Sequence, residues 1–201
     1  MKLYYSPGAC SLAVHIALRE AGAKFDLTKV DLATHRLTDG SDYFEISPRG
    51  YVPMLELDNG SRHTEVAALL QHVAESASRA NLLGEANGRR FEILQWLTFV
   101  STELHKTFSP WLWHKDTADS TRTAVQDKLA ARFAELDRHL AAHEHLAGDF
   151  SVADAYCFTI VNWANLLALP LKPYPNLQAY LTRLASRPHV RDALVAEGLA
   201  R

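Results

Sequence analysis

The stretch MKLYYSPGACSLAVHIALREAG, residues 1–22, decides the fold of the first part of the chain. Lys2 to Tyr5 is a short apolar run typical of a strand, and Ser6-Pro7-Gly8 ends it. From Ser11 to Ala21, apolar residues recur near helical spacing, and Gly22 supplies a stop signal. The pattern predicts a strand, then a loop, then a helix.

The residues that follow continue this alternation of strands and helices. Phe25 to Leu32 reads as a second strand, and one helical turn is expected near Asp42 to Ile46. Met54 to Leu57 is predicted to be a third strand. Asn59-Gly60 after it favours a tight hairpin turn, so Ser61 to His63 is predicted to be the return strand. Thr64 is then expected to cap a helix that ends near Ser76. The predicted order is βαβαββα.

Beyond a polar linker, residues 77–88, the strand signals disappear. Pro and Gly separate a series of helical patterns. These patterns cover residues 89–108, 121–143, 152–169, 176–186 and 190–196. The prediction is therefore an α/β domain at residues 1–77 and an all-helical domain at residues 88–201.

Composition narrows the classes of function. Lys and Arg number 21 against 23 Asp and Glu, so no strong overall charge attracts nucleic acid or an anionic membrane. No segment approaches the ~20 continuous apolar residues that span a bilayer, and the start of the chain lacks the apolar core of a signal peptide. We expect a cytoplasmic protein whose partners are small molecules.

Cys10 is the first candidate for chemistry. It lies at the start of the predicted helix, where unpaired backbone N–H groups and the helix dipole stabilise a thiolate. A dithiol redox site is excluded because the residue three positions later is Ala13. The remaining roles are a mixed disulfide with an external thiol, a hydrogen bond to a bound sulfur, or a small apolar side chain under the loop. Ser11 and Tyr5 lie close by as hydroxyl donors; the alternatives are a helix cap for Ser11 and a strand core residue for Tyr5, and for Tyr5 we favour the core residue.

Two later segments could bind an extended peptide. A cis bond at Val52-Pro53 would turn the backbone of Val52 outward as a short antiparallel partner, whereas a trans proline at the start of a strand needs no function. Glu65, in a first helical turn, could hold the ammonium group of an amino acid while nearby N–H groups hold its carboxylate. The alternative for Glu65 is simple stabilisation of the helix.

The long helix after the linker has two faces. Ile93, Leu97, Val100 and Leu104 form an apolar stripe, and Thr98, Thr102 and His105 form a polar one that could face a cleft. His105 could tune a thiol or meet a carboxylate, or it could simply be exposed. The aromatic residues that follow are either core or an apolar substrate pocket. They are Phe108, Trp111 and Trp113.

The remaining motifs favour structure over chemistry. Ser151 and Asp154 have the spacing of a capping box, and Cys157 lies in an apolar run that predicts a buried, inert thiol. We expect no metal site, because no carboxylate or cysteine completes a ligand set with the nearby histidines. These are His139, His143 and His145.

Together these residues resemble the glutathione transferases, specifically the bacterial beta class, over nearly the whole chain. The motifs that carry the resemblance are residues 1–12, Gly50-Tyr51-Val52-Pro53, Asn59-Gly60, Glu103-Leu104-His105-Lys106, residues 148–156 and Arg187-Pro188-His189-Val190. The resemblance implies a thioredoxin-like N-terminal domain, a helical domain with electrophile pocket and dimer contacts, and a homodimer. It also implies conjugation of glutathione to small hydrophobic electrophiles, with thiol exchange or peroxide reduction as possible side activities through Cys10.

The resemblance also implies roles for individual residues. Cys10 would contact the glutathione sulfur, Val52 would pair with the cysteinyl backbone beside cis-Pro53, and Glu65 with the Val66 N–H would hold the γ-glutamyl end. His105 would reach toward the thiol from the helical domain.

Three positions depart from the usual pattern of the class. Val66 replaces a small residue, His35 replaces a Lys and so weakens the clamp on the glycyl carboxylate near neutral pH, and Thr98 replaces a longer Asn. A non-catalytic ligand-binding protein of the same fold is the alternative function.

Overall fold

The computed structural model describes residues 1–77, 81–85 and 88–200, and they form two compact units. The first unit joins Met1–Leu82 to Arg187–Arg201, and the second is Leu83–Ser186. The predicted helical domain, residues 88–201, differs from this at its end. Helix α9 (Pro188–Ala196) packs against α1 (Ser11–Glu20), and Arg187 contacts both carboxylate oxygens of Glu20 at 3.0 and 3.1 Å.

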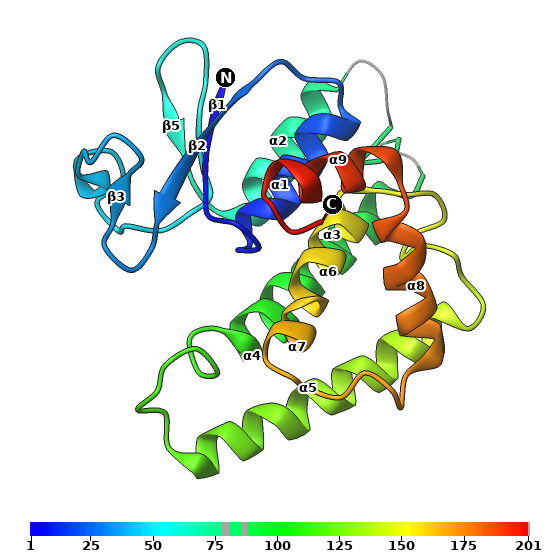
Figure 1. The fold of residues 1–201 in the computed structure, drawn as a ribbon. Coiled ribbons are helices and arrows are strands. Elements are labelled where there is room, and N and C mark those ends of the chain that lie inside the picture. Colours follow the sequence, from blue (N-terminus) through cyan, green and yellow to red (C-terminus); the bar gives the residue numbers. More distant parts are fainter. Residues whose placement is uncertain (78–80, 86–87, 201) are drawn as a thin grey trace. The chain divides into compact units, whose positions relative to one another are not determined.

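A five-stranded sheet of order β3-β2-β1-β4-β5 forms the centre of the first unit (Figure 1). The strands are β1 (Lys2–Tyr5), β2 (Asp26–Asp31), β3 (Arg36–Leu37), β4 (Met54–Glu56) and β5 (Arg62–His63). Strand β1 pairs parallel to β2 and antiparallel to β4, with Leu3 opposite both Leu27 and Leu55. The sheet therefore places β4, the first strand of the hairpin, beside the N-terminal strand, and β5 at the edge.

Apolar side chains pack on both faces of this sheet, as the alternation along β1 requires. Tyr4, on one face, belongs to a buried cluster with Val30, Tyr43, Val52 and Met54. On the other face, Leu3 and Leu55 are fully buried, and α1 packs against α2 (Val66–Ser76). Val52 is therefore anchored in a core while remaining next to the loop that follows β1.

The second unit contains only helices in its described part. They are α3 (Arg90–Phe99), η2 (Val100–His105), α4 (Lys106–Phe108), α5 (Asp119–Leu140), α6 (Val152–Val161), α7 (Trp163–Leu166) and α8 (Pro175–Ala185). All ten residues of α6 are buried, because α3 and η2 pack against it. The predicted apolar stripe is confirmed: its four residues, Ile93, Leu97, Val100 and Leu104, are at most 1% exposed.

Several sequence predictions need correction in detail. The helix predicted at residues 89–108 changes to π-helical geometry at Val100–His105. The pattern predicted at 152–169 is two helices, α6 and α7. The short strand β3 was not predicted, and the predicted turn near Asp42 is the 3-10 helix η1 (Tyr43–Glu45).

The start of α2 also differs from the prediction. Glu65, and not Thr64, precedes the helix, and no side chain caps it. By contrast, the capping box of α6 is confirmed, with hydrogen bonds in both directions between Ser151 and Asp154. No helix in the described ranges is both long enough and apolar enough to cross a membrane.

Candidate functional site

Cys10 lies at the N-terminal end of α1 and is partly exposed. The expectation of unpaired N–H groups at this helix start is wrong for Leu12 and Ala13, because they donate to Ala9 O at 3.0 Å and Cys10 O at 3.2 Å. The dipole of α1 remains as a favourable field for a negative charge near this end. A thiolate at Cys10 would therefore be stabilised by the dipole of α1 as a whole, and not by the N–H groups of Leu12 and Ala13.

The loop that carries Cys10 is fixed by Ser11. Its buried hydroxyl accepts a hydrogen bond from Ser6 N–H and donates one to Ser6 O, each at 3.2 Å. Ser11 therefore fixes the loop. The helix cap that the sequence offered for Ser11 is not formed by its hydroxyl. Tyr5 is buried in β1 as predicted, and burial, with the nearby Glu197 carboxylate, raises the pKa of its hydroxyl.

The thiol of Cys10 reaches the loop before β4. Cys10 Sγ donates a hydrogen bond to Val52 O over 3.3 Å, and the Val52-Pro53 peptide bond is cis. Val52 and Pro53 are both buried, so this backbone is held by the core beneath it. The structure thus brings together Cys10 and Val52, which are 42 residues apart in the sequence.

Glu65 has an unusual backbone and an exposed side chain. Its φ is 72°, a left-handed value that costs energy in a residue with a side chain. This backbone leads directly into Val66, the first residue of α2, where the first N–H groups have no partner within the helix. The carboxylate of Glu65 lies 2.8 Å from Arg49 Nη1. Sequence reasoning did not single out Arg49.

His35 lies on the turn after β2, at a φ of 52°. Its ring packs at 4.5 Å from the Phe44 ring, and its Nδ1 is buried without a hydrogen-bond partner among the described residues. A Cβ at Gly50 would come within 2.7 Å of that nitrogen, so Gly50 is required for this packing. Among the residues that the structure describes, this buried nitrogen next to Gly50 therefore has no hydrogen-bond partner.

A buried hydrogen-bonded pair that sequence reasoning missed, His15 and Glu197, holds the loop that carries Cys10. Glu197, just after α9, accepts hydrogen bonds from Gly8 N–H at 2.9 Å and from His15 Nδ1 at 2.8 Å. Arg19 Nε donates to the other ring nitrogen of His15. Because Gly8 directly precedes Ala9 and Cys10, the C-terminal segment fixes the loop that carries the thiol.

The polar stripe of the second unit is only partly available for ligands. Thr98 and Thr102 are exposed, and each hydroxyl donates to the carbonyl four residues earlier in its own helix. His105 Nδ1 lies 2.7 Å from the Tyr156 hydroxyl. Burial, with a smaller effect of Lys106, lowers the pKa of His105 to about 4. At neutral pH His105 is therefore uncharged, and it can donate a hydrogen bond without supplying a positive charge.

The aromatic residues after η2 divide into core and surface. Phe108 is fully buried against Phe133 and Trp163, which confirms the core interpretation for it. That interpretation is wrong for Trp111 and Trp113, which are 46% and 44% exposed. Trp113 still packs edge-on against Trp163 at 5.5 Å.

Cys157, His139 and His143 take part in packing and in hydrogen bonds to the backbone. Cys157 is fully buried, and burial raises the pKa of its thiol, as expected for an inert residue. His139 and His143 are stacked at 4.2 Å, and each ring bonds a backbone carbonyl. Within the ranges that the structure describes, no group of His, Cys, Asp and Glu could hold a metal ion.

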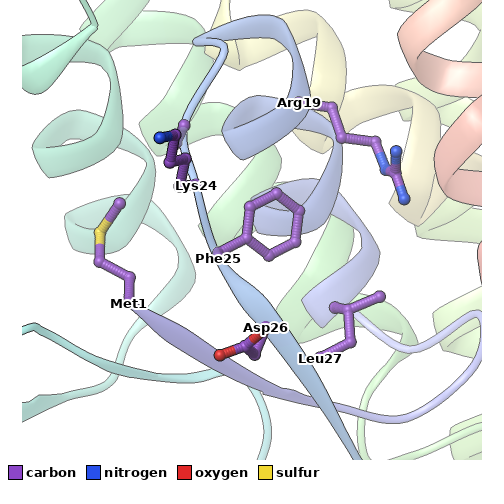
Figure 2. Close-up of a pocket in the computed structure, with 7 residues that line it drawn as sticks. Met1, Arg19, Lys24, Phe25, Asp26 and Leu27 are labelled. Atoms are coloured by element: carbon purple, nitrogen blue, oxygen red, sulfur yellow. The ribbon is translucent and has the colours of Figure 1, made fainter.

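A surface pocket is lined by residues other than the candidate site residues described above (Figure 2). Phe25 is at its centre, with Arg19 and Lys24 on either side of the ring. The other lining residues are Met1, Ala23, Asp26 and Leu27. None of the residues that the sequence marked as functional takes part in it.

Comparison with known proteins points to one family. The model of the glutathione S-transferase N-terminal domain matches residues 8–76, and that of the C-terminal domain matches residues 99–188. The glutathione S-transferase GstA of Escherichia coli O157:H7 is 43% identical over 99% of this chain and all of its own length.

Solved structures agree with the sequence matches. BphK, described as a bacterial glutathione S-transferase in a ternary complex, is 47% identical with a TM-score of 0.93 over 99% of this chain and all of its own. The beta-class enzyme of Sphingomonas chungbukensis is 43% identical with the same TM-score over both full chains. A sphingomonad glutathione S-transferase solved with glutathione is 42% identical, again with a TM-score of 0.93 and full coverage of both chains.

Proposed function

Because the chain belongs to the bacterial beta class of the glutathione S-transferase family and is itself a glutathione transferase, we propose that it conjugates the glutathione thiol to small hydrophobic electrophiles. The tripeptide binds to the first unit, along the cis-Pro53 loop and beside Cys10. The hydrogen bond between Cys10 Sγ and Val52 O carries this proposal, because it brings a sulfur and an extended backbone to one point.

Backbone pairing at Val52 places the cysteinyl residue of glutathione. In the free protein Val52 O accepts the Cys10 S–H, and an incoming ligand N–H can take this acceptor in its place. The S–H of Cys10 is then released to donate to the ligand sulfur. A hydrogen bond to a thiolate favours its charged form, so the pKa of the glutathione thiol falls.

The two ends of the tripeptide fit groups on either side of Val52. Glu65 and the Val66 N–H at the start of α2 are suited to the γ-glutamyl end, and the bulk of the Val66 side chain leaves that N–H unchanged. His35, on the turn after β2, is proposed to bind the glycyl carboxylate.

The chemical step is a nucleophilic displacement or addition. The glutathione thiolate attacks the electrophilic carbon, a C–S bond forms, and the bonding electron pair leaves with the departing group or moves onto the electrophile. The proton of the thiol goes to solvent. The protein contributes by holding the sulfur and by stabilising its charge before attack.

Thiol exchange is a second reaction that the same sulfur supports. Cys10 thiolate attacks the glutathione sulfur of a mixed disulfide, so that a Cys10–glutathione disulfide forms and the substrate leaves as a thiolate. A second glutathione thiolate then attacks this disulfide, releases Cys10 and departs as glutathione disulfide.

Several finer assignments remain proposals. Thr98, Thr102 and His105 are proposed to take part in glutathione binding, and Trp111 and Trp113 to hold the electrophile, whereas the fully buried Phe108 belongs to the core. The half-exposed rings of Trp111 and Trp113 support the second assignment, since apolar ligands bind next to aromatic surfaces. A homodimer and a cytoplasmic location are also proposed.

The experiment compares the parent, Cys10→Ala and Cys157→Ala with 1-chloro-2,4-dinitrobenzene as electrophile. The parent should conjugate glutathione well above the uncatalysed rate, and Cys157→Ala, which changes only a buried inert thiol, should match it. Cys10→Ala should show an altered rate and lose the glutathione mixed disulfide in a mass spectrum. A Cys10→Ala enzyme indistinguishable from the parent in both measurements would contradict the role of Cys10.

A further inference from the structure

Arg49 and Glu65 form an ion pair that folding does not require. Their side chains are 68% and 71% exposed, and Arg49 Nη1 lies 2.8 Å from Glu65 Oε1. Exposed pairs of this kind contribute little to stability, because water screens the attraction and two long side chains lose freedom. The pair is therefore available for a role in binding.

The backbone on both sides of the pair is well fixed. Gly50 N–H donates to Ser47 O at 2.7 Å, which closes a turn with Pro48 and Arg49 at its centre. The Tyr43 hydroxyl donates to Tyr51 O at 3.0 Å just beyond this turn. An exposed guanidinium thus projects from an anchored loop toward the residue that begins α2.

We propose that Arg49 and Glu65 together bind the zwitterionic amino-acid end of glutathione, with Arg49 as the residue that binds its α-carboxylate. This inference rests on the proposed function and adds Arg49 to the site. Glu65 takes the ammonium group, while Arg49 and the first N–H groups of α2 take the carboxylate. When the ligand binds, the Arg49–Glu65 ion pair separates, and each side chain pairs with the ligand group of opposite charge. No charge is therefore left without an opposite charge.

The chain offers a matched control for general effects of charge. Arg62 Nε and Glu56 Oε2 form a second pair at the same 2.8 Å, also in the first unit, with an exposed Arg62 and a half-buried Glu56. Arg62→Ala therefore removes the same charge and the same kind of contact as Arg49→Ala. Only Arg49 is expected to matter for the ligand.

The test measures binding by calorimetry at low salt, with S-methylglutathione as the probe because its blocked sulfur removes any effect of thiol ionisation. Arg49→Ala should bind about tenfold more weakly, as for the loss of one charge-assisted hydrogen bond, and Arg62→Ala should bind like the parent. A probe whose γ-glutamyl α-carboxylate is converted to an amide should lose a similar factor with the parent. With Arg49→Ala the same amidation should cause a smaller loss, because only the N–H groups of α2 still bind the carboxylate.

A charge reversal separates ligand binding from a structural role of the pair. The double variant Arg49→Glu/Glu65→Arg retains an ion pair but inverts its complementarity to the ligand, so binding should be lost while the unfolding curve stays like that of the parent. Equal affinity of Arg49→Ala and parent, or a full loss on amidation in both, overturns the role of Arg49 alone. Absence of S-methylglutathione binding to the parent overturns the proposed function as well.

Discussion

The two cysteines show how position decides the chemistry of one residue type. Cys10 is partly exposed at a helix end and bonds a backbone carbonyl, whereas Cys157 is fully buried in α6, where burial raises the pKa of its thiol. Thiolate, and not thiol, is the reactive form. The two sulfurs should therefore differ greatly in reactivity.

Titration of the native protein with a chromogenic disulfide reagent at pH 8 should detect one reactive thiol, and titration after unfolding should detect two. In Cys10→Ala the native signal should disappear, and in Cys157→Ala it should persist. A native signal that survives in Cys10→Ala would show that the reactive sulfur has been assigned to the wrong residue.

His105 predicts a specific dependence of stability on pH. Its pKa is lowered to about 4, below the ordinary value of 6.5, so the unfolded chain binds more protons between these values. The contribution of neutral His105 to stability is therefore complete above pH 6.5 and is lost as pH falls toward 4. In His105→Asn this dependence is absent.

The free energy of unfolding of the parent relative to His105→Asn should rise by about 2 kcal/mol from pH 4.5 to pH 7.5, a value reduced for the partial exposure of the ring. Urea unfolding at several pH values measures this difference. A difference that stays constant with pH would mean that His105 has an ordinary pKa.

The residues that sequence reasoning found are those whose neighbours in the chain already indicate a special position. Cys10 follows a loop signal, Pro53 precedes a strand, and Glu65 precedes a helix. Arg49 and Glu197 lack such a local signal, because their partners lie 16 and up to 189 residues away. A charged residue in a loop gives no indication of its partner until the fold is known.

At the level of elements, α6 depends on the network around its first turn. Asp154 is fully buried and accepts hydrogen bonds from Leu146 N–H, the Ser151 backbone and hydroxyl, and the Tyr180 hydroxyl. The sequence predicted the reciprocal bonds with Ser151 from their spacing. It could not predict those with Leu146, in the loop before α6, and Tyr180, in α8.

Replacing Ser151 by Ala should lower the free energy of unfolding by about 1 kcal/mol, the usual cost of a lost cap. Asp154→Ala should cost more, about 3 kcal/mol, because several buried donors lose their acceptor. Ser120→Ala, an exposed serine in the first turn of α5, is the control and should be neutral. Equal stability of all three variants would contradict a structural role for the network.

Element boundaries were less predictable than element types. Apolar spacing indicated one continuous helix over residues 89–108, but a π-helical segment interrupts it at Val100–His105. A π turn keeps Val100 and Leu104 buried, so the apolar pattern looks the same in either geometry. Strand β3 was missed because two residues are too few to form a periodic pattern.

At the scale of the whole molecule, the C-terminal segment packs against the loop that carries Cys10. Residues 187–201 belong with the sheet unit, because Glu197 bonds Gly8 and His15, and Arg187 bonds Glu20. Helical periodicity assigned this segment to the helical domain, since periodicity does not report the surface on which a helix packs. The Cys10 loop therefore depends on residues at the opposite end of the sequence.

Glu197→Ala should lower the free energy of unfolding of the first unit by about 3 kcal/mol, because the part-buried Gly8 N–H and the buried His15 both lose a partner. Hydrogen exchange should report faster exchange in α1. Asp192→Ala, on an exposed position of α9, should change neither. Unchanged exchange in α1 for Glu197→Ala would contradict the dependence of the Cys10 loop on α9.

A crystal structure of this protein with glutathione tests the central claim most directly. We predict the cysteinyl backbone paired with Val52 and the glutathione sulfur within hydrogen-bond distance of Cys10 Sγ. A tripeptide bound elsewhere, for instance in the pocket around Phe25, with Cys10 still bonded to Val52 O, would contradict the account.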